Sequence, residues 1–141
     1  MGKINLGRVV LGGLLAGLII NIGEYLCNII FLGKLWTDAM AALNRSGFGA
    51  ESAALYIILF FALGIFSVWI YAAIRPRFGA GPMTAICAGL VVWFLATFCS
   101  SVGSLPLNLF PGKLLFYSAL WELFEFPIAT LIGAWIYKEQ A

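Results

Sequence analysis

Four long apolar stretches dominate the chain, at about residues 6–32, 52–74, 82–104 and 112–137. Each reaches the length of about 20 mostly apolar residues that a helix needs to cross the hydrocarbon core of a bilayer. Backbone N–H and C=O groups in hydrocarbon must be satisfied within their own segment, so such continuous runs predict helices. The pattern predicts an all-α fold class: an integral membrane four-helix bundle that forms a single transmembrane domain over residues 1–141.

The segments between these stretches carry their own patterns. In residues 34–50 the apolar side chains recur at helical spacing, at Trp36, Ala39, Met40 and Leu43. This spacing predicts a short helix lying in the membrane interface, and an ordinary structured loop is the alternative. We expect Thr37 to begin this helix and Gly47 to end it. Residues 105–111 contain two prolines, which forbid a regular helix there.

The basic residues indicate an orientation. With the N-terminus inside, one group is cytoplasmic: Lys3, Arg8, Arg75, Arg77 and Lys138. The other group is outside: Lys34, Arg45 and Lys113. Since Lys and Arg are enriched in cytoplasmic loops, we expect a multi-pass protein of the cell (inner) membrane with both termini cytoplasmic and residues 75–77 in a cytoplasmic turn. No cleavage site follows the first stretch, so we expect it to be retained.

Composition supports lipid as the main solvent. The chain is 63% hydrophobic and 10% charged, with a mean hydropathy of +1.04, whereas soluble domains have about 45–50% apolar and about 25% charged residues. The net charge of +2 and the lack of a Lys/Arg-rich run argue against nucleic acid as a partner. The expected partners are the lipid bilayer and either further copies of the chain or a larger membrane complex.

Cysteine and histidine usage narrows the chemistry further. The three cysteines, Cys27, Cys87 and Cys99, lie in apolar stretches without a C-x-x-C pair, which predicts small buried apolar residues rather than disulfides. The chain has no histidine, the commonest ligand of haem and catalytic zinc and the usual base of a catalytic triad. We therefore expect no enzyme, assign no catalytic residue, and leave any cofactor or metal unknown.

Three glutamates inside the apolar stretches are the chemically unusual feature. Glu24 lies in the first stretch, and Glu122 and Glu125 lie in the fourth. An ionisable side chain at such depth costs several kcal/mol and marks a functional site unless it pairs with something polar. The first helix is expected to run outward and the fourth inward. At about 1.5 Å per residue, the three carboxyl groups then reach similar depth.

Polar residues accompany the glutamates at helical spacing. Asn21 and Asn28 share a face with Glu24, and Ser118 shares a face with the glutamates of the fourth stretch. The third stretch adds hydroxyl groups in its outer half, at Thr97, Ser100, Ser101 and Ser104. The candidate ligand-binding or cation-binding residues are therefore Glu24, Glu122, Glu125, Asn21, Asn28, Ser118 and Ser101.

The charge state of the glutamates separates two interpretations. No lysine or arginine is expected at their depth, and three neighbouring carboxylates cannot all stay ionised in a low dielectric. In the first interpretation they bind a proton, a metal ion or a cationic solute, and the protein is a small transport or ion-handling protein. In the second they are protonated groups that hydrogen-bond across helices in a non-catalytic accessory or structural subunit of a larger complex.

Small residues on the first stretch predict close helix packing. Gly13 and Gly17 form a small-xxx-small pattern, which lets two helix backbones approach. We expect this contact within the bundle, with a dimer seam as the alternative. If the protein transports, four helices leave little room for a path, so it should act as a homo-oligomer or within a complex.

Two short motifs resemble a known family. The stretch Phe31-Leu-Gly-Lys-Leu-Trp36 and the later Gly133-Ala-Trp135 are similar to motifs of uncharacterised four-span bacterial membrane proteins of the DUF1761 type. The resemblance covers the layout of the whole chain but only short stretches of residues. Glu24-Tyr25 stands where the family often has an aromatic pair, and the last helix carries glutamates where the family commonly has a histidine. The resemblance implies a four-span fold and no particular activity.

Overall fold

The computed structural model describes residues 3–139, and it confirms the predicted all-α fold. Four helical segments are long and apolar enough to cross a membrane: Leu6–Phe31, Ala50–Phe78, Pro82–Leu107 and Gly112–Ile136. The protein is therefore a multi-pass membrane protein by the length and composition of its helices. The largest difference from the predicted bounds is at the second segment, which ends at Phe78 instead of residue 74.

Two of the four segments are composite. The first consists of helix α1, Leu6–Tyr25, followed by the π-helical segment η1, Leu26–Phe31. The third consists of α4, Pro82–Trp93, the π-helical segment η2, Phe94–Phe98, the short helix α5, Cys99–Ser104, and the 3₁₀ turn η3, Leu105–Leu107. The other two, α3 (Ala50–Phe78) and α6 (Gly112–Ile136), are continuous α-helices although each contains one proline.

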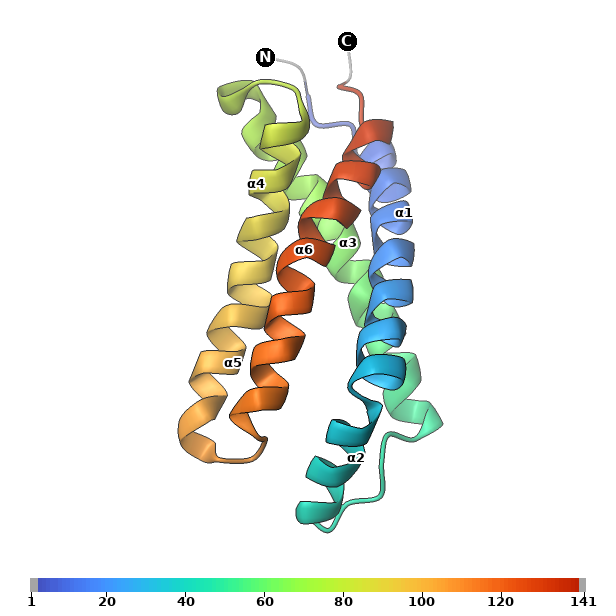
Figure 1. The fold of residues 1–141 in the computed structure, drawn as a ribbon. Helices are drawn as coiled ribbons and strands as arrows, with labels where there is room; N and C mark the ends of the chain where they lie inside the picture. Colours follow the sequence, from blue (N-terminus) through green and yellow to red (C-terminus); the bar gives the residue numbers. More distant parts are fainter. Residues whose placement is uncertain (1–2, 140–141) are drawn as a thin grey trace.

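The long helices run side by side, and the chain enters and leaves at the same end of the bundle (Figure 1). We call this the terminal end. The opposite end, which we call the α2 end, carries helix α2 (Gly33–Ala42) and the turn between η3 and α6. Helix α1 packs mainly against α3 and α6, and α4 packs against α6 and α3. The equal placement of both termini agrees with an even number of spans.

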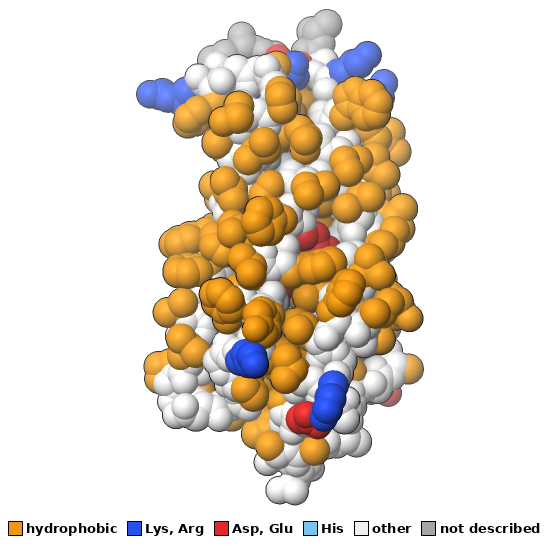
Figure 2. Space-filling view, in the orientation of Figure 1, with side chains coloured by type: hydrophobic (Ala, Val, Ile, Leu, Met, Phe, Trp, Pro, Cys, Tyr) orange, Lys and Arg blue, Asp and Glu red, His pale blue; other side chains and the backbone are white. Residues whose placement is uncertain are grey.

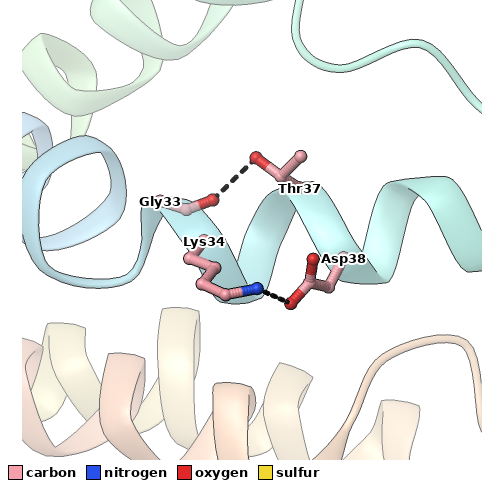
Figure 3. Close-up of polar contacts among 4 residues, drawn as sticks. All are labelled: Gly33, Lys34, Thr37 and Asp38. Carbon is pink, nitrogen blue, oxygen red and sulfur yellow. Dashed lines mark hydrogen bonds and ion pairs between the residues drawn. The ribbon is translucent and has the colours of Figure 1, made fainter.

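Helix α2 confirms the predicted short helix between the first two spans, although its bounds differ from those expected. It begins at Gly33 and ends at Ala42, so neither Thr37 nor Gly47 caps it. Thr37 Oγ1 instead donates to the carbonyl of Gly33 at 2.9 Å, and Lys34 Nζ lies 2.9 Å from Asp38 Oδ2 (Figure 3). Both charged side chains are exposed, so they form the wet face of an amphipathic helix.

The predicted turn at residues 75–77 is wrong. Arg75, Pro76 and Arg77 belong to the last turns of α3, which ends at Phe78 and is followed by Gly79. Gly79 and Gly81 make the turn into α4 with φ angles of 88° and 156°, a region that glycine enters at little cost because it has no Cβ.

Glycines bring helix backbones into contact in the half of the bundle near the termini. A Cβ built on Gly17 would lie 2.7 Å from Phe61 Cα of α3, and one on Gly13 would overlap the backbone of Ile65. On the facing helix, a Cβ on Gly64 would overlap the backbone of Gly17. The predicted small-residue stripe therefore packs within the bundle, where small residues let helices approach closely.

Apolar side chains cover the outside of the bundle. Figure 2 shows them over most of the visible face, with lysine and arginine at the two ends and acidic side chains about halfway between. Trp135 is 87% exposed and Met83 is 70% exposed, as suits lipid-facing positions. The cysteines are free, but only Cys27 is buried. The prediction of three buried cysteines is wrong for Cys87 and Cys99, which lie on this outer surface.

Candidate functional site

The two π-helical segments both supply a polar side chain to a glutamate. Asn28 belongs to η1 and bonds Glu24, while Thr97 belongs to η2 and bonds Glu122. π-helix is rare, at well under about 1% of residues, and single turns of it are frequent at functional sites. The coincidence of both π segments with the glutamates marks this region as the candidate site.

Glu24 lies at the end of α1 and is 6% exposed. Its Oε2 accepts from Asn28 Nδ2 at 2.5 Å, and its backbone carbonyl accepts from the same amide at 3.2 Å. Asn28 Oδ1 in turn accepts from Trp36 Nε1 of α2 at 2.8 Å. These bonds form a relay of side chains from α2 to the carboxyl group, and the bond from Trp36 fixes which end of the amide faces Glu24.

Glu122 lies on α6 and is partly buried. Its Oε2 accepts a hydrogen bond from Thr97 Oγ1 of η2. One turn away, Trp93 Nε1 donates to the carbonyl of Ala119 at 2.9 Å. These two contacts hold the third span against the fourth at the level of the glutamates.

Glu125 is 8% exposed and faces α1 across the helix contact. A Cβ built on Gly23 would overlap its carboxyl group, so the absence of a side chain at Gly23 is what admits the glutamate. Glu24 and Cys27 each lie close enough to Glu122 and Glu125 for their charges to interact. The predicted convergence of the glutamates at one depth therefore agrees with the structure.

Several buried polar atoms of this cluster lack a hydrogen-bond partner among residues 3–139. They are Oε1 of Glu24, both carboxyl oxygens of Glu125, Oγ of Ser118 and Nε1 of Trp121. A buried polar group without a partner costs about 1–3 kcal/mol. A carboxylate only accepts hydrogen bonds, whereas a protonated carboxyl group also donates one. Protonation would therefore supply donors where unpaired acceptors gather.

Charge within the site is not balanced by a basic side chain. The ion pairs of the described chain join Lys34 to Asp38 and Arg75 to Glu139, and neither involves Glu24, Glu122 or Glu125. Between residues 3 and 139, no group of three histidine, cysteine, aspartate or glutamate side chains is arranged to hold a metal ion. The arrangement suits proton binding, because a proton needs only one or two oxygen atoms.

Not every candidate polar residue joins this cluster. Asn21 Nδ2 donates to the carbonyls of Gly17 at 2.8 Å and Ile57 at 3.4 Å, so it ties α1 to α3. In the third span, Ser100 and Ser104 bond carbonyls of their own helix. Ser101 bonds only within its own helix, where its carbonyl accepts from Ser104, whereas Ser118 adds one of the unpaired buried atoms. The hydroxyl group that reaches a glutamate is that of Thr97.

Sequence reasoning missed three residues of the site. Gly23 and Trp121 each lie beside a glutamate in the chain, but neither has a polar spacing that would single it out. Trp36 was assigned to the apolar face of a helix, and it does pack with apolar neighbours. Its indole N–H adds the bond to Asn28. A tryptophan near a membrane helix end normally marks the interface, so only the fold shows its second role.

The cluster lies between two apolar cores. Toward the terminal end, Ile20 of α1 and Phe126 of α6 belong to the larger core. Toward the α2 end, Cys27 and Leu114 belong to a smaller one that also includes Leu32 and Ala39. The glutamates thus form a polar layer within an apolar bundle. Comparison with known proteins gave no match: no family model, no curated protein and no solved structure matches this chain.

Proposed function

We propose that this protein takes up and releases protons inside the bilayer, at Glu24, Glu122 and Glu125, as a small proton-handling transport protein. The observation that supports this most is the set of unpaired carboxyl oxygens at the contact between α1 and α6. Because protons convert acceptors into donors, gaining or losing one changes which hydrogen bonds the two helices share. Intramembrane carboxyl groups form the proton relays of pumps and transporters.

A proton fits this geometry better than a metal ion does. Calcium takes about 6–8 oxygen ligands and magnesium requires near-octahedral coordination, whereas the described residues offer no group arranged for a metal. Cys27 lies one turn from Glu24 in the chain, but its softer sulfur suits neither ion.

Proton flux into vesicles tests the proposal. Purified protein is reconstituted into liposomes that contain a pH-sensitive dye, and a potassium gradient with valinomycin sets the membrane potential. We expect wild type to acidify the lumen. With Glu24→Gln, Glu122→Gln or Glu125→Gln, we expect the rate of acidification to equal that of protein-free vesicles. Glu51→Gln is the matched control, because Glu51 is exposed in the first turn of α3.

Two outcomes would contradict the proposal. If folded wild type gives no flux beyond that of empty vesicles, the carboxyl groups are structural, and the role as an accessory subunit is the better account. If Mn²⁺ or Ca²⁺ raises the melting temperature of wild type but not of the Gln variants, the site binds a metal ion, because a ligand stabilises the state that binds it.

We further propose that the terminal end faces the cytoplasm of the cell (inner) membrane, because Arg75, Arg77 and Lys138 gather there. In a background without native cysteines, Ser46→Cys at the α2 end should react with an impermeant thiol reagent from outside. We also propose that the protein acts as a homo-oligomer or within a larger complex. Native mass spectrometry in mild detergent tests the assembly, and a lone monomer that is active in liposomes would contradict it.

A further inference from the structure

A cavity of about 430 Å³ lies at the α2 end, between η1, α2 and the loop that follows α2. Its wall includes Asn28, Trp36, Thr37, Arg45 and Gly47. Water occupies about 30 Å³ per molecule in the liquid and enters cavities that offer polar partners. Asparagine, threonine and arginine side chains in the wall provide such partners, so the cavity has both the room and the polarity for several water molecules.

This cavity shares two residues with the relay to Glu24. Asn28 and Trp36 line it, and the same two side chains are hydrogen-bonded to each other at 2.8 Å. Asn28 also donates to Glu24 Oε2 at 2.5 Å. The cavity wall and the buried carboxyl group are therefore separated by a single amide side chain.

We propose that this cavity is the water-filled entrance through which protons reach Glu24, with Asn28 and Trp36 as positioning residues between water and the carboxyl group. This inference rests on the proposed proton-handling function. A hydronium ion in the cavity gives its proton to a carboxyl oxygen of Glu24 through water that passes beside Asn28, and water is left behind. The amide of Asn28 and the indole of Trp36 do not carry the proton themselves. Arg45 is exposed at the rim, where solvent screens its positive charge.

A second cavity, of about 390 Å³, lies on the terminal side of the glutamates and is lined by Tyr71, Pro82, Trp135 and Tyr137 among others. The buried core that includes Ile20, Val68 and Phe126 belongs to the same half of the bundle. None of the glutamates lines this second cavity, whereas the cavity at the α2 end touches the relay directly.

Thiol labelling at the position of Glu24 tests the entrance without measuring proton flux. Glu24→Cys is made in a chain whose three native cysteines are replaced by alanine, and a small water-soluble methanethiosulfonate is the probe. We expect Glu24→Cys to be labelled when the cavity is otherwise unchanged. Adding Gly47→Trp should lower the labelling rate about tenfold or more, because thiol reactivity depends on access. Gly33→Leu, which also fills the cavity wall, should act in the same direction.

Gly103→Trp is the matched control. A Cβ at Gly47 or at Gly103 meets nothing within 4 Å, and one at Gly33 meets only the carbonyl of Asn28 at 3.8 Å. All three positions therefore have room for a Cβ, and circular dichroism melting verifies that each variant is folded. Gly103 lies on α5 and does not line the cavity, so labelling should be unchanged there.

The outcomes separate this inference from the proposed function. Slowed labelling in both plugged variants, with the control unchanged, supports the entrance. Labelling that is equally fast in all variants, or absent without a plug, overturns it. If the plugged variants slow labelling but wild type gives no proton flux in vesicles, proton transport is refuted and the water path is not. Flux that persists in Gly47→Trp with unchanged labelling refutes only the entrance.

Discussion

Helix α1 passes through two regions that differ in how closely helices approach. At Gly13, in the half near the termini, a Cβ would overlap the backbone of Ile65, and its nitrogen would lie only 2.9 Å away. At Gly23, ten residues later, the nearest atoms that a Cβ would meet belong to the carboxyl end of Glu125. The first glycine is required by contact between two backbones. The second makes room for a side chain.

The difference indicates a division of tasks within one small bundle. The terminal half is built from regular α-helix held at backbone distance by glycine, which fixes the positions of α1, α3 and α6. The half toward α2 contains both π-helical segments, the glutamates and the cavity lined by Asn28. Departures from regular helix are therefore concentrated where polar side chains must be aimed, and the regular half supplies the rigidity that holds them.

Among the changes that test this division, Gly13→Ala should have the largest effect on stability. The added methyl group cannot be accommodated by moving a side chain, so α1 must separate from α3, and such overpacking costs about 3 kcal/mol or more at a backbone contact. Gly7→Ala is the control, since its Cβ meets only Asn5 Oδ1 at 3.6 Å, and alanine favours helix by about 1 kcal/mol. Melting followed by circular dichroism in detergent measures both. Equal melting temperatures would show that the close contact is not needed.

Much of this division could be predicted from the sequence. Apolar length predicts the four spans, the spacing of Gly13 and Gly17 predicts close packing, and the opposite directions of the first and last spans predict that their glutamates meet. The π-helical segments could not be predicted, because their residues read as ordinary apolar helix. Asn21 was grouped with Glu24 because the two share a helix face, yet its amide ties α1 to α3. Ser101 was chosen for its hydroxyl group, whereas the hydroxyl that bonds a glutamate is that of Thr97. Which of several hydroxyl groups on a helix reaches a glutamate depends on a fraction of a turn.

A change of pH should have the next largest effect on stability. Raising the pH removes protons from the carboxyl cluster, and each ionisation leaves a charge beside other buried carboxyl groups. As the pH rises, the native state keeps these protons while the unfolded state has already released them, so wild-type stability should fall as the pH rises. The Glu24→Gln/Glu122→Gln/Glu125→Gln variant should be nearly insensitive, because its amides do not titrate. Cys27, which is also titratable, lies one turn from Glu24 in the chain, so Cys27→Ala is included in both proteins.

The test is a series of melting temperatures at increasing pH, measured for both proteins in the same detergent. A wild type that stays as insensitive as the Gln variant would show that the carboxyl groups do not titrate in the native protein. That result would weaken the proton proposal. A wild type that becomes more stable at high pH would contradict the expected fall of stability with pH.

Trp36→Phe should have a smaller effect. Phenylalanine keeps an aromatic ring near Phe48 and Phe110 but cannot donate to Asn28 Oδ1, and loss of one such hydrogen bond costs about 1 kcal/mol. With its amide no longer held, Asn28 should orient less firmly toward Glu24, so vesicle proton flux should change more than stability does. Trp69→Phe is the control, because Trp69 stacks on Phe66 at the lipid-facing surface. Equal flux in both variants would remove Trp36 from the relay.

Gly23→Ala should change stability least and is the sharpest test of the comparison. The methyl group would overlap the carboxyl group of Glu125, but that group ends a flexible side chain and rotates away at small cost. The higher helix propensity of alanine, about 1 kcal/mol, offsets part of that cost. Moving the carboxyl away from Glu24 reduces the repulsion that ionisation creates, so the fall of melting temperature with pH should become shallower than in wild type. Destabilisation as large as that of Gly13→Ala, or an unchanged pH series, would show that the two halves do not differ as described.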